Sequence, residues 1–164
     1  MKEIDISDLL GVWFHDVKIN RISVDYVKRE VEFECVIPVG AWNSPNWYGI
    51  TRGEIKGSLF LTGLFYFVVE PPDANYPYDD SKGIEITSEG SATTKEFTER
   101  SRLAASLLAL HHRSATTKEF TEKYAAHLSA MPQDLPEEAF LHWFYVSDWN
   151  TFIFVAATDV HFRT

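Results

Sequence analysis

The sequence predicts a mainly β fold in a single domain of 164 residues, an antiparallel sandwich or open barrel. About seven strands are expected, with a helical segment inserted before the last hairpin, so that the fold is α+β overall. Residues 29–39 alternate apolar and acidic side chains, which is typical of a strand with one buried face. Residues 64–69 read LFYFVV and are apolar on both faces. At 45% hydrophobic residues, the chain can bury a core.

The expected strands follow one another along the chain at residues 17–26, 29–39, 54–62, 64–70, 83–87, 139–146 and 151–162. The second strand buries Val31, Phe33, Cys35, Ile37 and Val39 between the acids Glu30, Glu32 and Glu34, which predicts Cys35 as a core residue. Gly63 predicts a bulge or sharp bend. The strand at 64–70 is expected to be central because both of its faces are apolar. The last two strands are expected to pair as a hairpin through residues 147–150.

An exact duplication interrupts this pattern. The string SATTKEFTE occurs at Ser91–Glu99 and again at Ser114–Glu122, 23 positions later. An identical run of this length indicates a recent or engineered sequence duplication. Each copy places Glu three residues after Thr, which suits a helix-capping box and predicts a helical segment at residues 91–130. Ser91–Arg113 is expected to be a dispensable insertion, since the second copy supplies the same helix start.

Composition restricts the compartment and the partners. The net charge is −9, and no cluster of Lys and Arg forms the basic surface that DNA or RNA requires. The acidic start MKEIDISDLL is the opposite of a signal peptide, and no apolar run approaches the length of a membrane helix. We therefore expect a cytoplasmic protein that contacts neither nucleic acid nor membrane. Cys35 is the single cysteine, which excludes an intrachain disulfide.

The loop at Gly40–Gly53 concentrates the aromatic residues Trp42, Trp47 and Tyr48 among Asn, Ser, Pro and Gly. Two interpretations remain open. These rings can line a small-ligand pocket, or they can fold back and plug the open end of a sandwich or barrel.

The loop at Glu70–Asp80 mixes tyrosines and acids between prolines. Aromatic side chains on a stiffened loop give a large contact area with little rotamer entropy to lose, and acids resist burial. The sequence therefore predicts a partner-binding surface formed by Asp73, Tyr76, Tyr78, Asp79 and Asp80.

Catalytic and metal-binding patterns are weak. The sequence contains no GxSxG, P-loop, HExxH or CxxC pattern, so no catalytic residue, metal or cofactor is expected. His15 with Asp16, His142, and His161 with Asp159 could converge across a sheet, but nothing in their spacing forces a common site.

Residues 13–33, WFHDVKINRISVDYVKREVEF, resemble the opening of small bacterial β-rich proteins, some of which are similar to immunity proteins of toxin systems. Those proteins carry an H-D-[AVS]-x-[IL] start and then an I-x-x-D strand and hairpin. The matching residues here are His15, Asp16, Val17, Ile19, Ile22 and Asp25. The resemblance implies a non-enzymatic, partner-binding cytoplasmic protein. His15 and Asp16, at the start of a strand, are expected to fix the first strand against the last through backbone hydrogen bonds.

The leading hypothesis is therefore a protein-binding module, an immunity-like inhibitor whose acidic loop faces a basic partner. The alternative is a small-ligand binder or enzyme that uses an aromatic pocket at Trp42, Trp47 and Tyr48.

Overall fold

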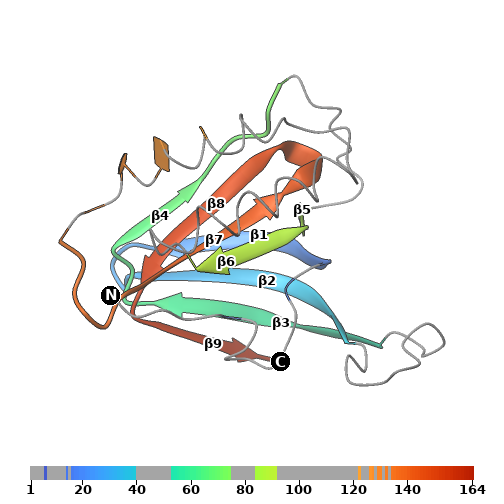
Figure 1. Cartoon of the computed structure of the whole chain (residues 1–164). Helices are drawn as coiled ribbons and strands as arrows, with labels where there is room; N and C mark the ends of the chain where they lie inside the picture. The colour runs from blue at the N-terminus through green and yellow to red at the C-terminus, as the bar shows by residue number, and fades with distance from the viewer. Residues whose placement is uncertain are drawn as a thin grey trace, which may run out of the picture.

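A computed structural model describes residues 6, 14, 16–39, 53–74, 84–91, 122, 126–127, 129–130, 132 and 134–164. This part of the chain contains nine strands and one short 3-10 helix, η2 (Figure 1). Their bounds are β1 Val17–Asp25, β2 Glu30–Val39, β3 Gly53–Thr62, β4 Tyr66–Val69, β5 Ile84–Ile86, β6 Ser88–Ser91, β7 Phe140–Val146, η2 Ser147–Trp149, β8 Thr151–Ala157 and β9 Asp159–Arg163.

The strands form two antiparallel sheets, which confirms the mainly β prediction. One sheet has the order β5-β1-β2-β3-β9, and the other has the order β4-β8-β7-β6. The predicted hairpin of the last two long segments is confirmed as the β7–β8 pair, in which Val146 lies opposite Thr151. The expected number of strands was too low by two. The predicted strand at 151–162 divides into β8 and β9 at Thr158, and these join different sheets, while β6 was not predicted.

Three bent segments carry the chain from one sheet to the other. The β3–β4 segment bends at Gly63, the β8–β9 segment bends at Thr158, and the β5–β6 segment bends at Thr87. Because β3 pairs with β9 and β4 pairs with β8, two of these segments stay paired on both sides of their bends. The pairs β6–β7 and β5–β1 complete a continuous circuit of strand pairing around the described part of the fold.

The main core lies between the two sheets. In β2 the side chains of Val31, Phe33, Cys35 and Ile37 are buried, as their alternation predicted. Phe33 packs edge-on against Phe144 of β7, with ring centroids 5.7 Å apart. Burial raises the pKa of the Cys35 thiol to about 11, so Cys35 is a protonated, apolar core residue near neutral pH.

Strands β7 and β8 are buried along their whole length. One set of alternate residues faces the main core, and the other set forms a second apolar cluster on the outer face of the same sheet. That cluster contains Leu141, Trp143, Tyr145, Phe152, Phe154 and Ala156, with Tyr66, Val68 and Leu135 packed against it. The prediction that the strand at 64–70 is central was therefore wrong. Strand β4 ends its sheet, and its second apolar face contributes to the outer cluster.

Two further predictions need correction. Strand β6, with the sequence SEGS, was not predicted because it has no apolar residue, and it places Ser91 opposite His142 in a sheet. The helical segment predicted from residue 91 therefore cannot begin there. Residues 92–121 lie outside the described residues. The few described residues between 122 and 130 do not define the two ends of an α-helix, so the helical insertion remains a prediction. Across the described residues, no helix is both long and apolar enough to span a membrane.

The expected contact between the first and last strands was also wrong. Strand β1 pairs with β2 and β5, whereas β9 lies at the opposite end of the same sheet beside β3. The backbone N–H of Asp16 donates to the carbonyl oxygen of Ile86 at 2.8 Å, so the start of β1 is fixed against β5. His15 lies outside the described residues.

The predicted bend at Gly63 is confirmed, and the backbone conformation and the close approach of Thr158 both require a glycine there. Its φ of 66° lies in the left-handed region, and a Cβ built on it would lie 2.1 Å from Oγ1 of Thr158. We predict that Gly63→Ala lowers the free energy of unfolding by about 3 kcal/mol, measured by urea denaturation, because backbone strain and overlap add. The same substitution in a Thr158→Ala background should cost less, and equal costs in the two backgrounds would contradict the overlap.

The identity of the two repeat copies makes a second test possible. Deletion of Ser91–Arg113, 23 residues, joins Gly90 to Ser114, and Ser114 then replaces the identical last residue of β6. We predict that the shortened protein still unfolds cooperatively, since the strand sequence and the second repeat copy are both retained. Circular dichroism during thermal unfolding measures this. Loss of a cooperative transition would show that Leu103, Leu107 and Leu108 belong to the core.

Candidate functional site

The base of the acidic loop runs beside the β7–β8 connection. The backbone N–H of Glu70 donates to the carbonyl oxygen of Phe152 at 3.0 Å, and that of Asp73 donates to the carbonyl oxygen of Trp149 at 2.9 Å. The hydroxyl of Thr151 donates to the carbonyl oxygen of Pro71 at 2.8 Å. The first residues of the loop are therefore held by a turn that is nearly 80 residues away in sequence.

Asn150 is the residue that joins this turn to the loop. Its φ is 48°, and only 4% of its surface is exposed. The hydroxyl of Tyr145 donates to Oδ1 of Asn150, and Nδ2 of Asn150 donates to Oδ2 of Asp73, both at 3.0 Å. Asp73, predicted as a partner-binding residue, thus uses one carboxylate oxygen within the fold. Tyr76, Tyr78, Asp79 and Asp80 lie outside the described residues.

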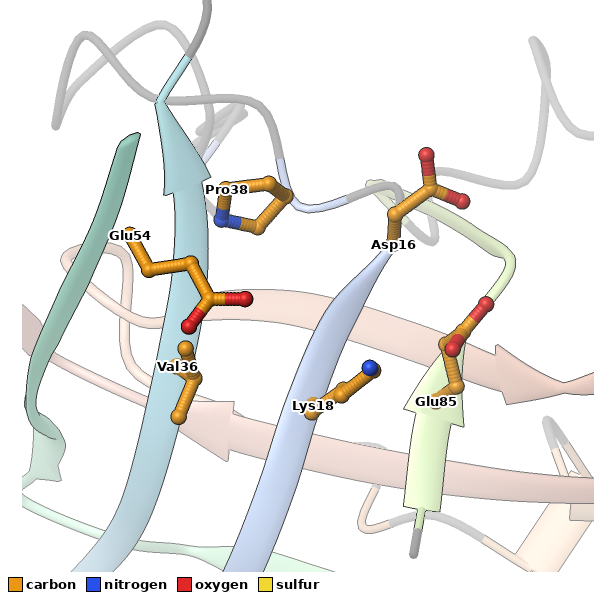
Figure 2. Close-up of a pocket in the computed structure, with 6 residues that line it drawn as sticks. All are labelled: Asp16, Lys18, Val36, Pro38, Glu54 and Glu85. Carbon is orange, nitrogen blue, oxygen red and sulfur yellow. The ribbon is translucent and has the colours of Figure 1, made fainter. Parts of the chain in front are cut away.

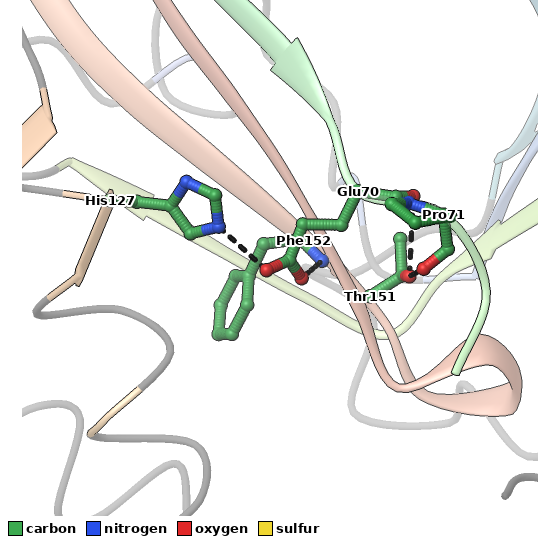
Figure 3. Close-up of polar contacts among 5 residues, drawn as sticks. All are labelled: Glu70, Pro71, His127, Thr151 and Phe152. Carbon is green, nitrogen blue, oxygen red and sulfur yellow. Dashed lines mark hydrogen bonds and ion pairs between the residues drawn. The ribbon is translucent and has the colours of Figure 1, made fainter. Parts of the chain in front are cut away.

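Glu70 connects the loop to a third part of the chain (Figure 3). Its Oε1 lies 2.6 Å from Nε2 of His127, and its Oε2 accepts the backbone N–H of Phe152 at 2.8 Å. The His127 ring packs on Phe154, with centroids 4.6 Å apart. Both side chains of the pair are largely buried, so the carboxylate holds the base of the loop, strand β8 and His127 together.

A shallow pocket of about 280 Å³ opens on the solvent face of the five-stranded sheet (Figure 2). It is lined by Asp16, Lys18, Val36, Pro38, Glu54 and Glu85. Lys18 lies opposite Glu85 in the β1–β5 pair, and Pro38 lies opposite Glu54 in the β2–β3 pair. The pocket therefore adjoins both ends of the predicted aromatic loop. Trp42, Trp47 and Tyr48 themselves lie outside the described residues.

Among the described histidines, His142 and His161 lie in different sheets and do not share a site. His142 is fully buried in β7, where its Nε2 lies 2.6 Å from Oε2 of Glu89. His161 is in β9, in the other sheet, with Nδ1 3.9 Å from Oδ2 of Asp159. Within the described ranges, no group of three or more His, Cys, Asp or Glu residues could hold a metal ion.

Three residues of the loop base were not singled out from the sequence: Glu70, His127 and Asn150. Asn150 was predicted only as one of the turn residues 147–150, since Asn favours turns and tolerates positive φ, and its contact with the loop was not predicted. The Glu70–His127 contact joins residues 57 apart and had no local signal. Comparison of the chain with protein-family models, with curated proteins and with solved structures found no match. Functional inference therefore depends on the geometry of the chain itself.

A pair of substitutions separates the two roles of Asn150. Asn150→Gly tolerates the positive φ but removes both side-chain hydrogen bonds, and we predict a loss of about 2 kcal/mol in the free energy of unfolding. Asn150→Ala removes the same bonds and adds backbone strain, so it should cost about 1 kcal/mol more. Urea denaturation of both variants measures the difference. If the Gly variant is as stable as the unsubstituted protein, the contact to Asp73 does not hold the loop.

Proposed function

We propose that the chain is a non-enzymatic protein-binding module, an immunity-like inhibitor that contacts a basic partner through the Glu70–Asp80 loop. The observation that carries the proposal is the anchored base of this loop. Residues 70–73 are held to the β7–β8 connection by backbone and side-chain hydrogen bonds. A segment that is held in place before binding, as residues 70–73 are, loses less conformational entropy when a partner arrives.

Charge supports the choice of partner. The protein has a net charge of −9, and the loop contains Asp73, Asp79 and Asp80 besides Glu70. Glu70 and Asp73 hold the loop base, and in this proposal Asp79 and Asp80 contact the partner. Complementary charge mainly accelerates association and selects against acidic competitors. A cytoplasmic location is part of this proposal.

The position of the predicted helical segment is part of the same proposal. The helical segment predicted at residues 91–130 would cover the outer face of the β4-β8-β7-β6 sheet. One contact supports this placement, since His127 packs on Phe154, which belongs to the outer cluster.

One observation favours a second candidate function. The pocket beside Pro38 and Glu54 adjoins the ends of the loop that carries Trp42, Trp47 and Tyr48. A small-ligand binder or enzyme would use this pocket with those rings. Ligand binding in this pocket would change the fluorescence of Trp42 and Trp47. Binding of a partner to the acidic loop does not require such a change.

Association with a basic nuclease at two salt concentrations tests the proposed function. An acidic inhibitor should bind several-fold more slowly at about 300 mM than at about 50 mM salt, because screening weakens steering. An acidic nuclease of similar size is the control. If the protein binds neither enzyme, or binds both with the same rate at both salt concentrations, the proposed electrostatic recognition is wrong.

Substitutions in the loop locate the contact. We predict that Tyr76→Ala or Tyr78→Ala weakens partner binding by about 2 kcal/mol, as expected for an aromatic hot spot. Neutralising Asp79 and Asp80 should mainly slow association. Surface plasmon resonance measures both effects, and the melting temperature is the control for folding. A sharply lowered melting temperature, with binding in proportion to the folded protein, would identify the rings as core plugs.

A further inference from the structure

The pocket on the five-stranded sheet opens where strands β1 and β2 part. The pairing of β1 with β2 reaches Lys18, which lies opposite Val36. Asp16 has a φ of 69°, and its backbone N–H donates to the carbonyl oxygen of Ile86 at 2.8 Å, so the chain before β1 runs beside β5. Strand β2 continues beside β3 as far as Val39. The pocket of about 280 Å³ therefore has β1 and β5 on one side and β2 and β3 on the other.

Side chains of both charge signs line this pocket without being paired to one another. Lys18 lies directly opposite Glu85 in the β1–β5 pair, a position in which opposite charges commonly interact. Within the described part of the chain, neither of these side chains forms an ion pair or a side-chain hydrogen bond, and the same is true of Glu54. In Figure 2 the Glu54 carboxylate reaches into the pocket from the β3 side, and Lys18 extends from β1 toward Glu85. These charges can therefore contact a ligand without breaking an ion pair among the described residues.

The surface between these charges is apolar. Val36 and Pro38 are two residues apart on β2, so their side chains lie on the same face of the sheet, and both are partly buried. They lie between Glu54 on β3 and Lys18 on β1. A small-molecule site commonly combines an apolar surface with a few converging polar groups, and its volume starts at roughly 300 Å³. The pocket has both features and suits a small ligand.

We infer that this pocket binds a free α-amino acid with an apolar side chain. The ammonium group of the ligand binds the carboxylate of Glu54, and its carboxylate binds the ammonium group of Lys18, through charge-assisted hydrogen bonds. The ligand side chain packs on Val36 and Pro38. A ligand with both charges matches both sides of the pocket. A simple cation would lie beside Lys18, and a simple anion would face three carboxylates, so each meets a like charge that a zwitterion can offset.

This inference goes beyond the proposed inhibitor and does not depend on it. The pocket lies on the five-stranded sheet, whereas the base of the Glu70–Asp80 loop is held by the β7–β8 connection of the other sheet. The inference gives the second candidate function a ligand class, and it requires only described residues. The predicted aromatic loop at Gly40–Gly53 begins and ends beside the same pocket.

Titration of the full ¹⁵N-labelled chain with L-leucine, followed by NMR, tests the inference. The backbone amides of Lys18, Val36 and Glu85 should shift with a dissociation constant of about 1 mM, which suits a small ligand in an open pocket. Two relatives of leucine each lack one charge at about pH 6.5, where a free α-amino group is protonated. L-Leucinamide lacks the carboxylate, and N-acetyl-L-leucine lacks the ammonium group. Each relative should bind at least tenfold more weakly than leucine, because one charge-assisted contact is lost.

Matched substitutions locate the contact. Lys18→Gln and Glu54→Gln should each weaken leucine binding at least tenfold, since each removes one of the two charged contacts. Lys56→Gln and Glu34→Gln remove the same charges from exposed positions on the same face of the sheet, outside the pocket, and should leave binding nearly unchanged. Thermal unfolding of the four variants confirms that each is folded.

Each other outcome overturns the inference. If either relative binds as tightly as leucine, a single charge is sufficient and the pocket does not recognise a zwitterion. Absence of shifts at the pocket with leucine at about 20 mM excludes the site at any affinity of the expected order. Equal weakening by Lys18→Gln and Lys56→Gln would show a general effect of charge. Association with a basic nuclease is measured separately, so the inhibitor proposal and this one fail independently.

Discussion

The fold depends on strands that remain hydrogen-bonded while they bend from one sheet into the other. At the corner between β3 and β4, Gly63 adopts a left-handed backbone, and the backbone N–H of Thr158 donates to the carbonyl oxygen of Thr62 at 3.0 Å. Because β3–β4 and β8–β9 bend side by side, the backbone groups on both sides of the corner stay paired. Buried backbone groups without partners are costly, so this continuity lets two sheets enclose one core.

The same architecture explains where the acidic loop is fixed. Strands β7 and β8 are buried on both faces, so the turn between them is held by a large apolar surface. Asn150 connects this turn to the loop, because its side chain is hydrogen-bonded both to Tyr145 within the sheet and to Asp73 in the loop. The start of the loop, residues 70–73, is thus held by the turn between two strands that are buried along their whole length.

Local pattern predicted most of the strands, and long-range pairing decided the rest. The alternation in β2 identified its buried face correctly, since a period of two reports directly which side chains face the core. The same reasoning failed for β4, because apolar side chains on both faces indicate two covering layers and do not determine the position of a strand within its sheet. Strand β6 had no signal at all, as SEGS pairs with β7 through its backbone. At the candidate site, composition identified the loop, but the roles of Glu70 and His127 follow from a contact 57 residues apart.

The acidic residues of the loop divide into two groups with different consequences for recognition. Glu70 and Asp73 are partly buried and hold parts of the chain together, because their carboxylate oxygens have hydrogen-bond partners in His127, Phe152 and Asn150. A carboxylate that already has such partners contributes less to a new contact, because it must exchange one set of hydrogen bonds for another. A carboxylate that speeds association through long-range attraction alone does not have to exchange hydrogen bonds. Composition alone therefore overstates how many carboxylates of the loop a proposed partner could contact without breaking hydrogen bonds within the chain.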